Sequence, residues 1–401
     1  MSQGTGWLDR RVTGYAEWLI RWRWAVVIVS FVVAIAAATG GQFLGFSTNY
    51  RVFFSPQNPQ LQAFESLQRI YVREDNISIV IRPHQGSVFQ AGLLRDVRAL
   101  TEDAWKVPYA TRVDSITNFQ NSTAEGDDLA VRDLVPADSP LDAADLARIR
   151  EAALAEPLIR DRLIAPDART LSVNITVTLP LKSETEVPES MAYARQLVDG
   201  FRQAHPEVRV ALTGSVALNH AFSESAEHDI TTLVPLMYGV LLLVMGLLLR
   251  SIAGTVATLL VIGLSAASAM GLAGWFGIML TPPSVTAPTI ILTLAIADSI
   301  HILITMLQNM RRGADKRTAL VESLRINFEP VFLTSLTTFI GFVSLNFSDA
   351  PPFRDLGNIT AIGVAAAWIY SIGFLPALMA ILPVRVKQRP IGYSGAMDRL
   401  A

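Results

Sequence analysis

The sequence contains no cysteine, has few charged residues and carries no excess of positive charge. The absence of cysteine excludes disulfide frameworks, thiolate metal sites and cysteine nucleophiles. The formal net charge is −2 and no run is rich in Lys and Arg, so the chain lacks the basic field that attracts nucleic acid. We therefore expect no nucleic-acid partner.

Charged residues make up 17% of the 401 residues and hydrophobic residues 51%. Soluble domains usually carry about a quarter charged residues, so a membrane protein is the first class to test. A helix that crosses the hydrocarbon layer of about 30 Å needs about 20 predominantly apolar residues. We predict such transmembrane helices over six stretches, 24–46, 230–249, 252–278, 284–309, 328–347 and 357–383.

The first of these stretches has features of a signal peptide. Arg21 and Arg23 precede it, and Ala34-Ile35-Ala36 resembles a small-residue cleavage site. Its apolar part of about 20 residues is too long for the hydrophobic region of a signal peptide. We predict an uncleaved anchor that follows a cytoplasmic segment over residues 1–23.

The positions of Lys and Arg predict the orientation in the membrane. Outside residues 47–227 there are 15 basic residues, and 14 of them become cytoplasmic if the N-terminus is cytoplasmic, with Arg354 as the exception. We predict a multi-pass protein of the bacterial inner (cell) membrane with both termini cytoplasmic. Residues 47–227 are then periplasmic, and residues 384–401 form a cytoplasmic tail.

Residues 47–227 hold 25 acidic and 18 basic residues, a composition typical of a mildly acidic soluble domain. Alternating apolar and polar residues predict strands over 76–81 and 171–181. Helical spacing predicts helices over 57–71, 87–105 and 188–204. This order suggests two βαβ-like units in an α+β split βαβ sandwich, with short helices and loops over 118–168.

Residues 310–327 join the fourth and fifth predicted spans. Ala319, Leu320, Leu324 and Ile326 lie among charged residues there, a pattern typical of an interfacial amphipathic helix. A solvated connector whose basic flanks only determine the topology explains the same pattern. The sequence leaves both interpretations open.

One carboxylate, Asp298, lies deep inside a predicted span, within the apolar stretch 290–303. A charged side chain at the membrane centre costs at least about 2.5 to 3.5 kcal/mol on insertion scales, so we expect Asp298 to face the bundle interior or a wet cavity. A proton carrier is the functional interpretation, because ionisable residues inside membranes are functional by default. The structural alternative is a carboxyl that only hydrogen-bonds a neighbouring helix.

His301 and Thr305 follow Asp298 by three and seven positions, which places all three on one helical face. A relay through His301 is one interpretation, since the reference pKa of histidine is about 6.5. A histidine kept neutral by a hydrogen bond is the alternative.

Hydroxyl groups cluster in the fifth span at Thr334, Ser335, Thr337 and Thr338. Thr334 and Thr338 share a face and are candidates for lining the same interior path as Asp298. Hydroxyls on transmembrane helices also bond commonly to their own carbonyls, so packing alone is the competing explanation.

The third span repeats a small residue at every fourth position, at Gly263, Ala267 and Gly271, which indicates close helix packing. No G-x-S-x-G, H-E-x-x-H, Walker loop or Gly-rich dinucleotide fingerprint occurs. We predict a secondary active transporter, without enzymatic activity, cofactor or metal, that is driven by an ion gradient.

The layout of one span, a large loop and five further spans resembles half of a transporter of the resistance-nodulation-division (RND) superfamily. Residues 334–345, with the sequence TSLTTFIGFVSL, resemble the fifth-span signature of its MMPL-like, hydrophobe-exporting branch. Leu375-Pro376-Ala377-Leu378 resembles the end of the sixth span, and residues 53–67 resemble the stretch that follows the first. Together these segments extend over most of the chain.

This resemblance implies a transmembrane bundle with a ferredoxin-like porter domain, and proton-driven export or trafficking of hydrophobic or lipid-like substrates from the inner membrane or periplasm. Asp298 matches the family's proton-relay position, with Ser299, His301, Thr334 and Thr338 as further relay candidates. The implied partners are the substrate, membrane lipids, a second transporter half or a second copy, and a periplasmic adaptor. A sterol- or lipid-sensing membrane module and a SecDF-like assistant to protein secretion are the alternative functions.

A short motif recurs near the two ends of the sequence. Residues 6–10 and 395–399 share the spacing G-x-x-D-R. A second copy of the whole unit would begin at the later motif, so we expect this chain to be the N-terminal half of a protein roughly twice as long.

Overall fold

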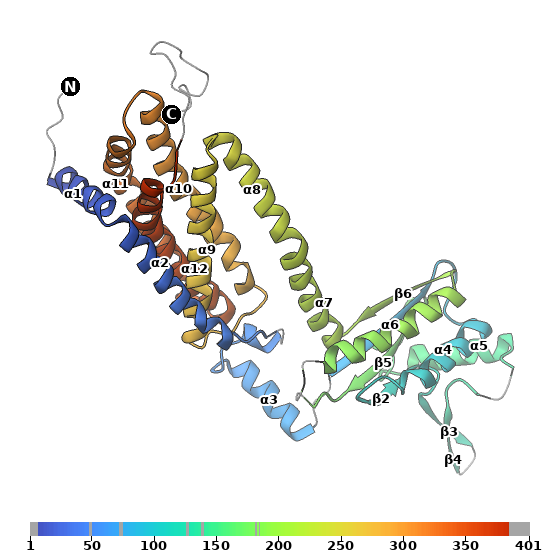
Figure 1. The fold of residues 1–401 in the computed structure, drawn as a ribbon. Coiled ribbons are helices and arrows are strands. Elements are labelled where there is room, and N and C mark those ends of the chain that lie inside the picture. Colours follow the sequence, from blue (N-terminus) through green and yellow to red (C-terminus); the bar gives the residue numbers. More distant parts are fainter. Residues whose placement is uncertain are drawn as a thin grey trace. The chain divides into compact units, whose positions relative to one another are not determined.

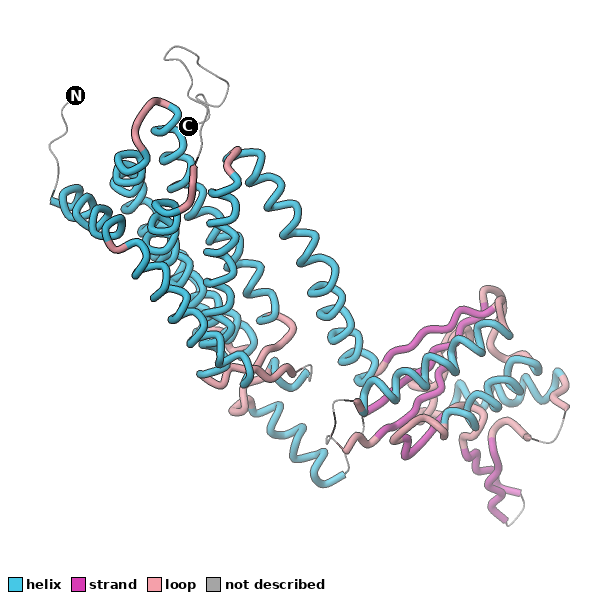
Figure 2. Tube along the Cα trace, viewed as in Figure 1, coloured by secondary structure: helices cyan, strands magenta, loops and turns pink. Residues whose placement is uncertain are grey.

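The computed structural model describes residues 7–47, 50–71, 75–125, 128–137, 140–180, 183 and 185–384. The chain divides into two compact units, Met1–Pro56 with Ser225–Ala401, and Gln57–Glu224. The first is a bundle of helices, and the second combines helices with strands (Figures 1 and 2).

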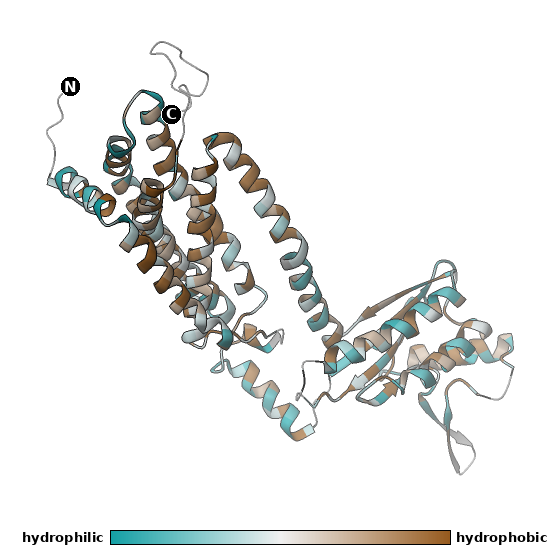
Figure 3. Cartoon of the chain, in the orientation of Figure 1, coloured by the Kyte–Doolittle hydropathy of each residue, from teal (hydrophilic) through white to brown (hydrophobic). Residues whose placement is uncertain are grey.

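Six helical stretches of the described chain are long and apolar enough to cross a membrane, which confirms the prediction of six spans. Figure 3 shows the predominance of hydrophobic residues along these helices. The stretches are Arg23–Phe43 (α2, Arg23–Ala38, and η1, Thr39–Phe43), Ser215–Leu249 (α7, Ser215–His228; η3, Asp229–Leu233; α8, Val234–Leu249), Ile252–Trp275 (α9), Ser284–Arg311 (η4, Ser284–Thr286, and α10, Ala287–Arg311), Lys316–Phe347 (α11, Lys316–Val343, and η5, Ser344–Phe347) and Pro351–Ile381 (α12, Pro351–Ile369; η6, Tyr370–Phe374; α13, Leu375–Ile381).

A tight turn joins the second and third stretches. Arg250 ends α8 in the left-handed conformation, with φ of 47°. The hydroxyl of Ser251 then accepts the backbone N–H of Gly254 at 3.2 Å and caps α9. These two residues reverse the chain without a longer loop.

The segment expected as an amphipathic connector forms the first turns of α11. Asp315 caps this helix, and hydrogen bonds from the Thr318 hydroxyl and from the backbone N–H groups of Thr318 and Arg317 lower the pKa of its carboxyl group. Ala319, Leu320 and Leu324 are buried in the bundle core. Because these apolar side chains pack against other helices, the segment continues into the fifth span as one helix.

An amphipathic helix lies instead at the start of the chain, at α1 (Trp7–Arg21). Its buried stripe consists of Val12, Ala16 and Leu19, which belong to the bundle core. Arg325 of α11 pairs with Asp9 of α1 at 3.2 Å. The sequence predicted this segment only as a cytoplasmic N-terminus.

Glycines bring α2 and η1 close to α9. A Cβ atom on Gly271 would overlap the carbonyl oxygen of Ala37, and one on Gly274 would overlap the carbonyl oxygen of Gly40. A Cβ atom on Gly263 would meet nothing within 4 Å. The close packing predicted from the small residues of the third span therefore occurs at Gly271 and Gly274, near the end of α9.

The second unit is built on a four-stranded antiparallel sheet in the order β2-β5-β1-β6, with strands β1 (Asp75–Pro83), β2 (Ala110–Asp114), β5 (Leu171–Val177) and β6 (Val208–Thr213). Ile79 of β1 lies opposite Val173 of β5 and Leu212 of β6. Helix α4 (Ala91–Ala104) follows β1, and α6 (Glu186–Ala204) follows β5. This order confirms the α+β fold of the split βαβ type.

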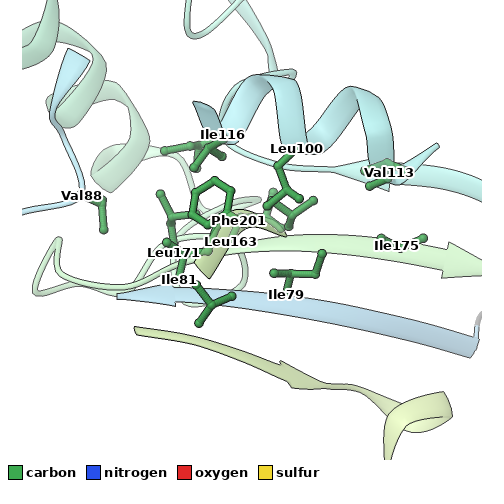
Figure 4. Close-up of a cluster of buried hydrophobic side chains, with 14 of the residues drawn as sticks. Ile79, Ile81, Val88, Leu100, Val113, Ile116, Leu163, Leu171, Ile175 and Phe201 are labelled. Carbon is green, nitrogen blue, oxygen red and sulfur yellow. The ribbon is translucent and has the colours of Figure 1, made fainter. Parts of the chain in front are cut away.

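One face of this sheet forms the apolar core of the second unit. Ile77, Ile79 and Ile81 alternate along β1 and are fully buried, as the apolar and polar alternation predicts. Figure 4 shows Ile79 and Ile81 next to Phe201 of α6.

Helix α3 (Pro59–Tyr71) precedes the sheet in the sequence. It begins after Asn58, whose side chain accepts hydrogen bonds from the backbone N–H groups of Gln60 and Leu61.

The region 118–168 contains a hairpin that the sequence did not predict. Strands β3 (Gln120–Glu125) and β4 (Asp128–Asp133) pair in an antiparallel ladder. Strand β3 is almost entirely polar, and β4 has only Leu129 and Val131 at alternate positions, a pattern too short to predict a strand. The expected short helix is present as α5 (Ala143–Ala155), which begins with a capping box between Asp142 and Asp145.

Candidate functional site

Asp298 lies in α10 and is only 5% exposed. The hydroxyl group of Ser335 in α11 donates a hydrogen bond to Oδ2 of Asp298 at 3.0 Å. Among the described residues, no Lys, Arg or His side chain forms an ion pair with this carboxyl group. A single neutral donor therefore holds the buried carboxyl group.

The side of α11 that meets α10 has a buried residue at every fourth position, Ser323, Asn327, Val331 and Ser335. Three of these four residues are polar. This spacing places them in one stripe along the helix, and the stripe determines which hydroxyl of the fifth span reaches Asp298.

Two further contacts join this stripe to α10. The side-chain amide of Asn327 donates to the Thr305 hydroxyl at 2.9 Å, and the Ser323 hydroxyl donates to the carbonyl oxygen of Ile302 at 2.5 Å. Thr305 lies seven residues after Asp298, about 10 Å along the helix axis. Polar groups thus continue from Asp298 toward the end of the bundle where α10 and α11 are connected.

Ser299 is fully buried and contacts a different helix from Asp298. Its hydroxyl lies 3.5 Å from the hydroxyl of Ser371 in η6, and the neighbouring Tyr370 hydroxyl lies 3.0 Å from that of Ser268 in α9. Segment η6 is a short π-helical turn, and such turns are rare and frequent at functional sites. The buried polar groups next to Asp298 therefore extend to the third and sixth spans.

The structure places the remaining candidate residues away from the carboxyl group. His301 is exposed, and its imidazole makes no hydrogen bond to another described residue. Thr334 is exposed and donates to the carbonyl oxygen of Pro330 at 2.8 Å. Thr338 is half-buried and donates to the carbonyl oxygen of Thr334 at 2.8 Å. Both threonines therefore bond to their own helix, and neither contacts Asp298.

Ser335 is the functional candidate that the sequence reasoning did not select, although it lies between the two threonines that were selected. The available signal was the spacing of Ser323, Asn327 and Ser335, since polar residues at multiples of four positions share one helical face.

The arrangement is suited to binding and releasing a proton. A buried carboxyl group that pairs with a cation stays charged, whereas the neutral Ser335 hydroxyl leaves both protonation states of Asp298 accessible. Among the described residues, no cluster of three or more His, Cys, Asp or Glu side chains is arranged to hold a metal ion. The Asp298 carboxyl group and the Ser335 hydroxyl group can take part in proton transfer and hydrogen bonding.

The chain is similar in sequence to known proteins. The sequence profile of the MMPL family matches residues 79–392. The hopanoid transporter HpnN of Rhodopseudomonas palustris is 29% identical over 206 residues, which cover 49% of this chain and 24% of that transporter. A membrane protein of Methanocaldococcus jannaschii is 25% identical over 178 residues, which cover 44% of this chain and 45% of that protein. The matched segments thus span less than half the length of either relative.

Proposed function

Because the chain belongs to the MMPL family of membrane transporters, within the RND superfamily, we propose that it exports or traffics hydrophobic or lipid-like molecules with the proton gradient as its energy source. The similarity to a protein named as a hopanoid transporter supports a lipid-like substrate. The proposed site of proton coupling is Asp298. The substrate would be taken from the inner membrane or the periplasm.

The observation that carries this proposal is the buried carboxyl group of Asp298 in α10, which accepts a hydrogen bond from Ser335 and forms no ion pair among the described residues. Burying a carboxylate at this depth costs free energy, which points to a functional role for Asp298. Reversible protonation is the role that fits its neutral hydrogen-bond donor. When Asp298 is charged, the Ser335 hydroxyl donates to it. When Asp298 is protonated, the remaining carbonyl oxygen still accepts that bond, so the contact persists through the cycle.

The contacts along α10 and α11 suggest where the proton leaves. Thr305 and Asn327 form the next polar pair beyond Asp298. Ser323 lies one turn nearer the start of α11 than Asn327. By the positive-inside rule the α10–α11 connection is cytoplasmic, since Arg311, Arg312 and Arg317 lie at or next to it. We place the proton path between Asp298 and the cytoplasm along this pair, with His301 in an auxiliary role.

A second half or a second copy of the chain belongs to the proposal. The apolar side chains of Leu333, Leu336 and Ile340 on α11 are between 37% and 58% exposed, next to Thr334. Transporters built from repeats form their pathway where the repeats meet. We place the partner on this face of α11, so that Thr334, Thr338 and His301 become part of the interface.

The test is transport by the intact protein in proteoliposomes with an imposed proton gradient, measured together with proton flux reported by a pH-sensitive dye. Asp298→Asn keeps the size of the side chain but cannot exchange a proton, so coupled lipid export and proton flux should both fall to background. Asp349→Asn, an exposed position, serves as the matched control and should transport normally. Full export by Asp298→Asn at normal protein level would eliminate the proton-coupling proposal. Lipid binding without export by the unmodified protein would instead favour a lipid-sensing module.

A further inference from the structure

An apolar groove of about 490 Å³ lies between the start of the chain and the sixth span. One side is lined by α1 and α2 and the residue between them, with Tyr15, Trp18, Leu19, Trp22, Ala25, Val26, Val29 and Ser30. The other side is lined by the end of α12 and by part of the π-helical turn η6, with Ile369, Ile372, Gly373 and Phe374. Its lining is almost entirely aliphatic and aromatic, so a hydrocarbon chain fits it better than a polar ligand.

The groove has a structural cause in the π-helical turn. The Tyr15 hydroxyl donates to the carbonyl oxygen of Ile372 at 3.4 Å, which holds α1 against η6. Gly373 carries no side chain, and a Cβ atom added there would reach only the Tyr15 hydroxyl at 3.6 Å. The space between α1, α2 and η6 is thus kept open by the backbone, and no apolar side chain of these segments fills it.

A second hollow, of about 740 Å³, adjoins the groove and shares Trp18 and Trp22 with it. Arg21, Arg23 and Arg317 line this hollow, together with Glu17. All three arginines are exposed, and among the described residues none of them pairs with a carboxylate. Three arginines therefore line a hollow that adjoins the apolar groove.

The two hollows lie at the depth where a lipid headgroup meets its acyl chains. Trp18, Trp22 and Trp24 are between 51% and 60% exposed, and exposed tryptophans are enriched at the boundary between membrane and water. The positive-inside rule assigns the arginine-rich side to the cytoplasm. From these two rules we infer that the groove faces the cytoplasmic leaflet, with the arginines at the level of its phosphates.

We propose that this site binds one anionic glycerophospholipid of the cytoplasmic leaflet. An acyl chain occupies the apolar groove, and the phosphate lies against Arg21, Arg23 and Arg317. The charge of the three unpaired arginines identifies the headgroup, since basic residues at this depth attract anionic lipids and a zwitterionic headgroup gains much less from them. This inference does not depend on proton-coupled transport, because none of these residues contacts Asp298 or its partners.

The test uses the purified full chain and native mass spectrometry. The protein is titrated with phosphatidylglycerol or with phosphatidylcholine of the same acyl chains. We expect one tightly retained phosphatidylglycerol and much weaker retention of phosphatidylcholine. The triple variant Arg21→Ala, Arg23→Ala, Arg317→Ala should lose this preference by about tenfold or more, since each basic residue near the surface strengthens binding by about fivefold.

Matched variants separate the two parts of the site. Arg312→Ala removes an exposed arginine at the same end of the bundle but outside both hollows, so it should keep the preference. The triple arginine-to-lysine variant retains the charge and should also keep most of it. Ala25→Trp fills the groove without changing the charge and should weaken retention of both lipids.

Four outcomes would overturn the proposal. The first is equal retention of the two lipids by the unmodified chain, which would mean ordinary annular lipid. The second is an unchanged preference in the triple alanine variant. The third is that inorganic phosphate or glycerol phosphate competes as well as the intact lipid, because the acyl chain would then contribute nothing. A second copy of the chain bound at the groove would appear as a dimer that excludes the lipid, and would also refute the proposal.

Discussion

Ser335 of α11 donates a hydrogen bond of 3.0 Å to Asp298 of α10, and both side chains are less than 10% exposed. The serine joins two helices at the depth of a single buried carboxyl group. Because a serine hydroxyl binds the charged and the neutral carboxyl group alike, we propose that Ser335 positions Asp298 and does not itself carry the proton. This distinction separates the two residues experimentally.

We predict that Ser335→Ala slows proton-coupled transport without abolishing it. The variant loses one hydrogen bond between helices, which is worth roughly 0.6 to 1.7 kcal/mol in membrane bundles, and the carboxyl group loses its orientation. Thr334→Ala is the matched control, since Thr334 bonds to its own helix and lies outside this contact. Ser335→Thr retains a hydroxyl group and should restore part of the transport rate. Equal transport rates for Ser335→Ala and Thr334→Ala in the proteoliposome assay would mean that Ser335 has no positioning role.

The proposed cytoplasmic path leads to a prediction at Asn327. Asn327→Leu keeps the approximate volume but removes the contact with Thr305, so proton release from Asp298 should slow and the transport rate should fall. Proton flux measured after a rapid pH jump, together with steady-state export, reports this change. Asn346→Leu alters an asparagine of η5, beyond the other end of α11, where its side chain bonds to Asn358, and should leave the release rate unchanged.

If the proton reaches Asp298 by another route, Asn327→Leu and Asn346→Leu will have the same effect on flux. That result would leave the assignment of Asp298 intact and remove only the path.

The sequence predicted the spans and the split βαβ fold well, because each depends on a local pattern. Apolar runs of about 20 residues identify spans wherever they occur, and the alternation of Ile77, Ile79 and Ile81 identifies a half-buried strand. The β3–β4 hairpin was missed, since β3 is almost entirely polar and β4 has only two alternating apolar residues, Leu129 and Val131.

The buried carboxyl group was also predictable, whereas its hydrogen-bond partner was not. A carboxylate in an apolar run is conspicuous at Asp298, but the face of α11 that meets it depends on the packing of two helices far apart in the sequence. Thr334 and Ser335 are adjacent in the sequence and point to different sides of α11, and only the position of α10 selects between them. Ser371 and Tyr370 were missed for the same reason, because the turn of η6 that presents them has no sequence signature.

The topology can be tested cleanly, because the chain has no cysteine of its own. We predict that Asn121→Cys reacts with a membrane-impermeant maleimide in intact cells, since it lies in the domain assigned to the periplasm. Ala314→Cys, in the connection between α10 and α11, should react only after the inner face has been opened. The reverse pattern of labelling would invert the orientation, and with it the leaflet assigned to the lipid site.

The packing of α2 against α9 leads to a prediction about stability. Gly271 is buried, and any side chain there would overlap the backbone carbonyl of Ala37, whereas Gly263 lies two turns earlier on α9, is exposed and meets nothing within 4 Å. Backbone atoms cannot move aside without separating the helices, and overpacking of this kind costs about 1 to 3 kcal/mol or more. Gly271→Leu should therefore lower the melting temperature in detergent and reduce the protein level in the membrane. Gly263→Leu adds the same side chain to the same helix and should remain within about 0.5 kcal/mol of the unmodified protein. Equal destabilisation by both substitutions would show that leucine is harmful anywhere in α9, and that the contact between the first and third spans is looser than the glycines imply.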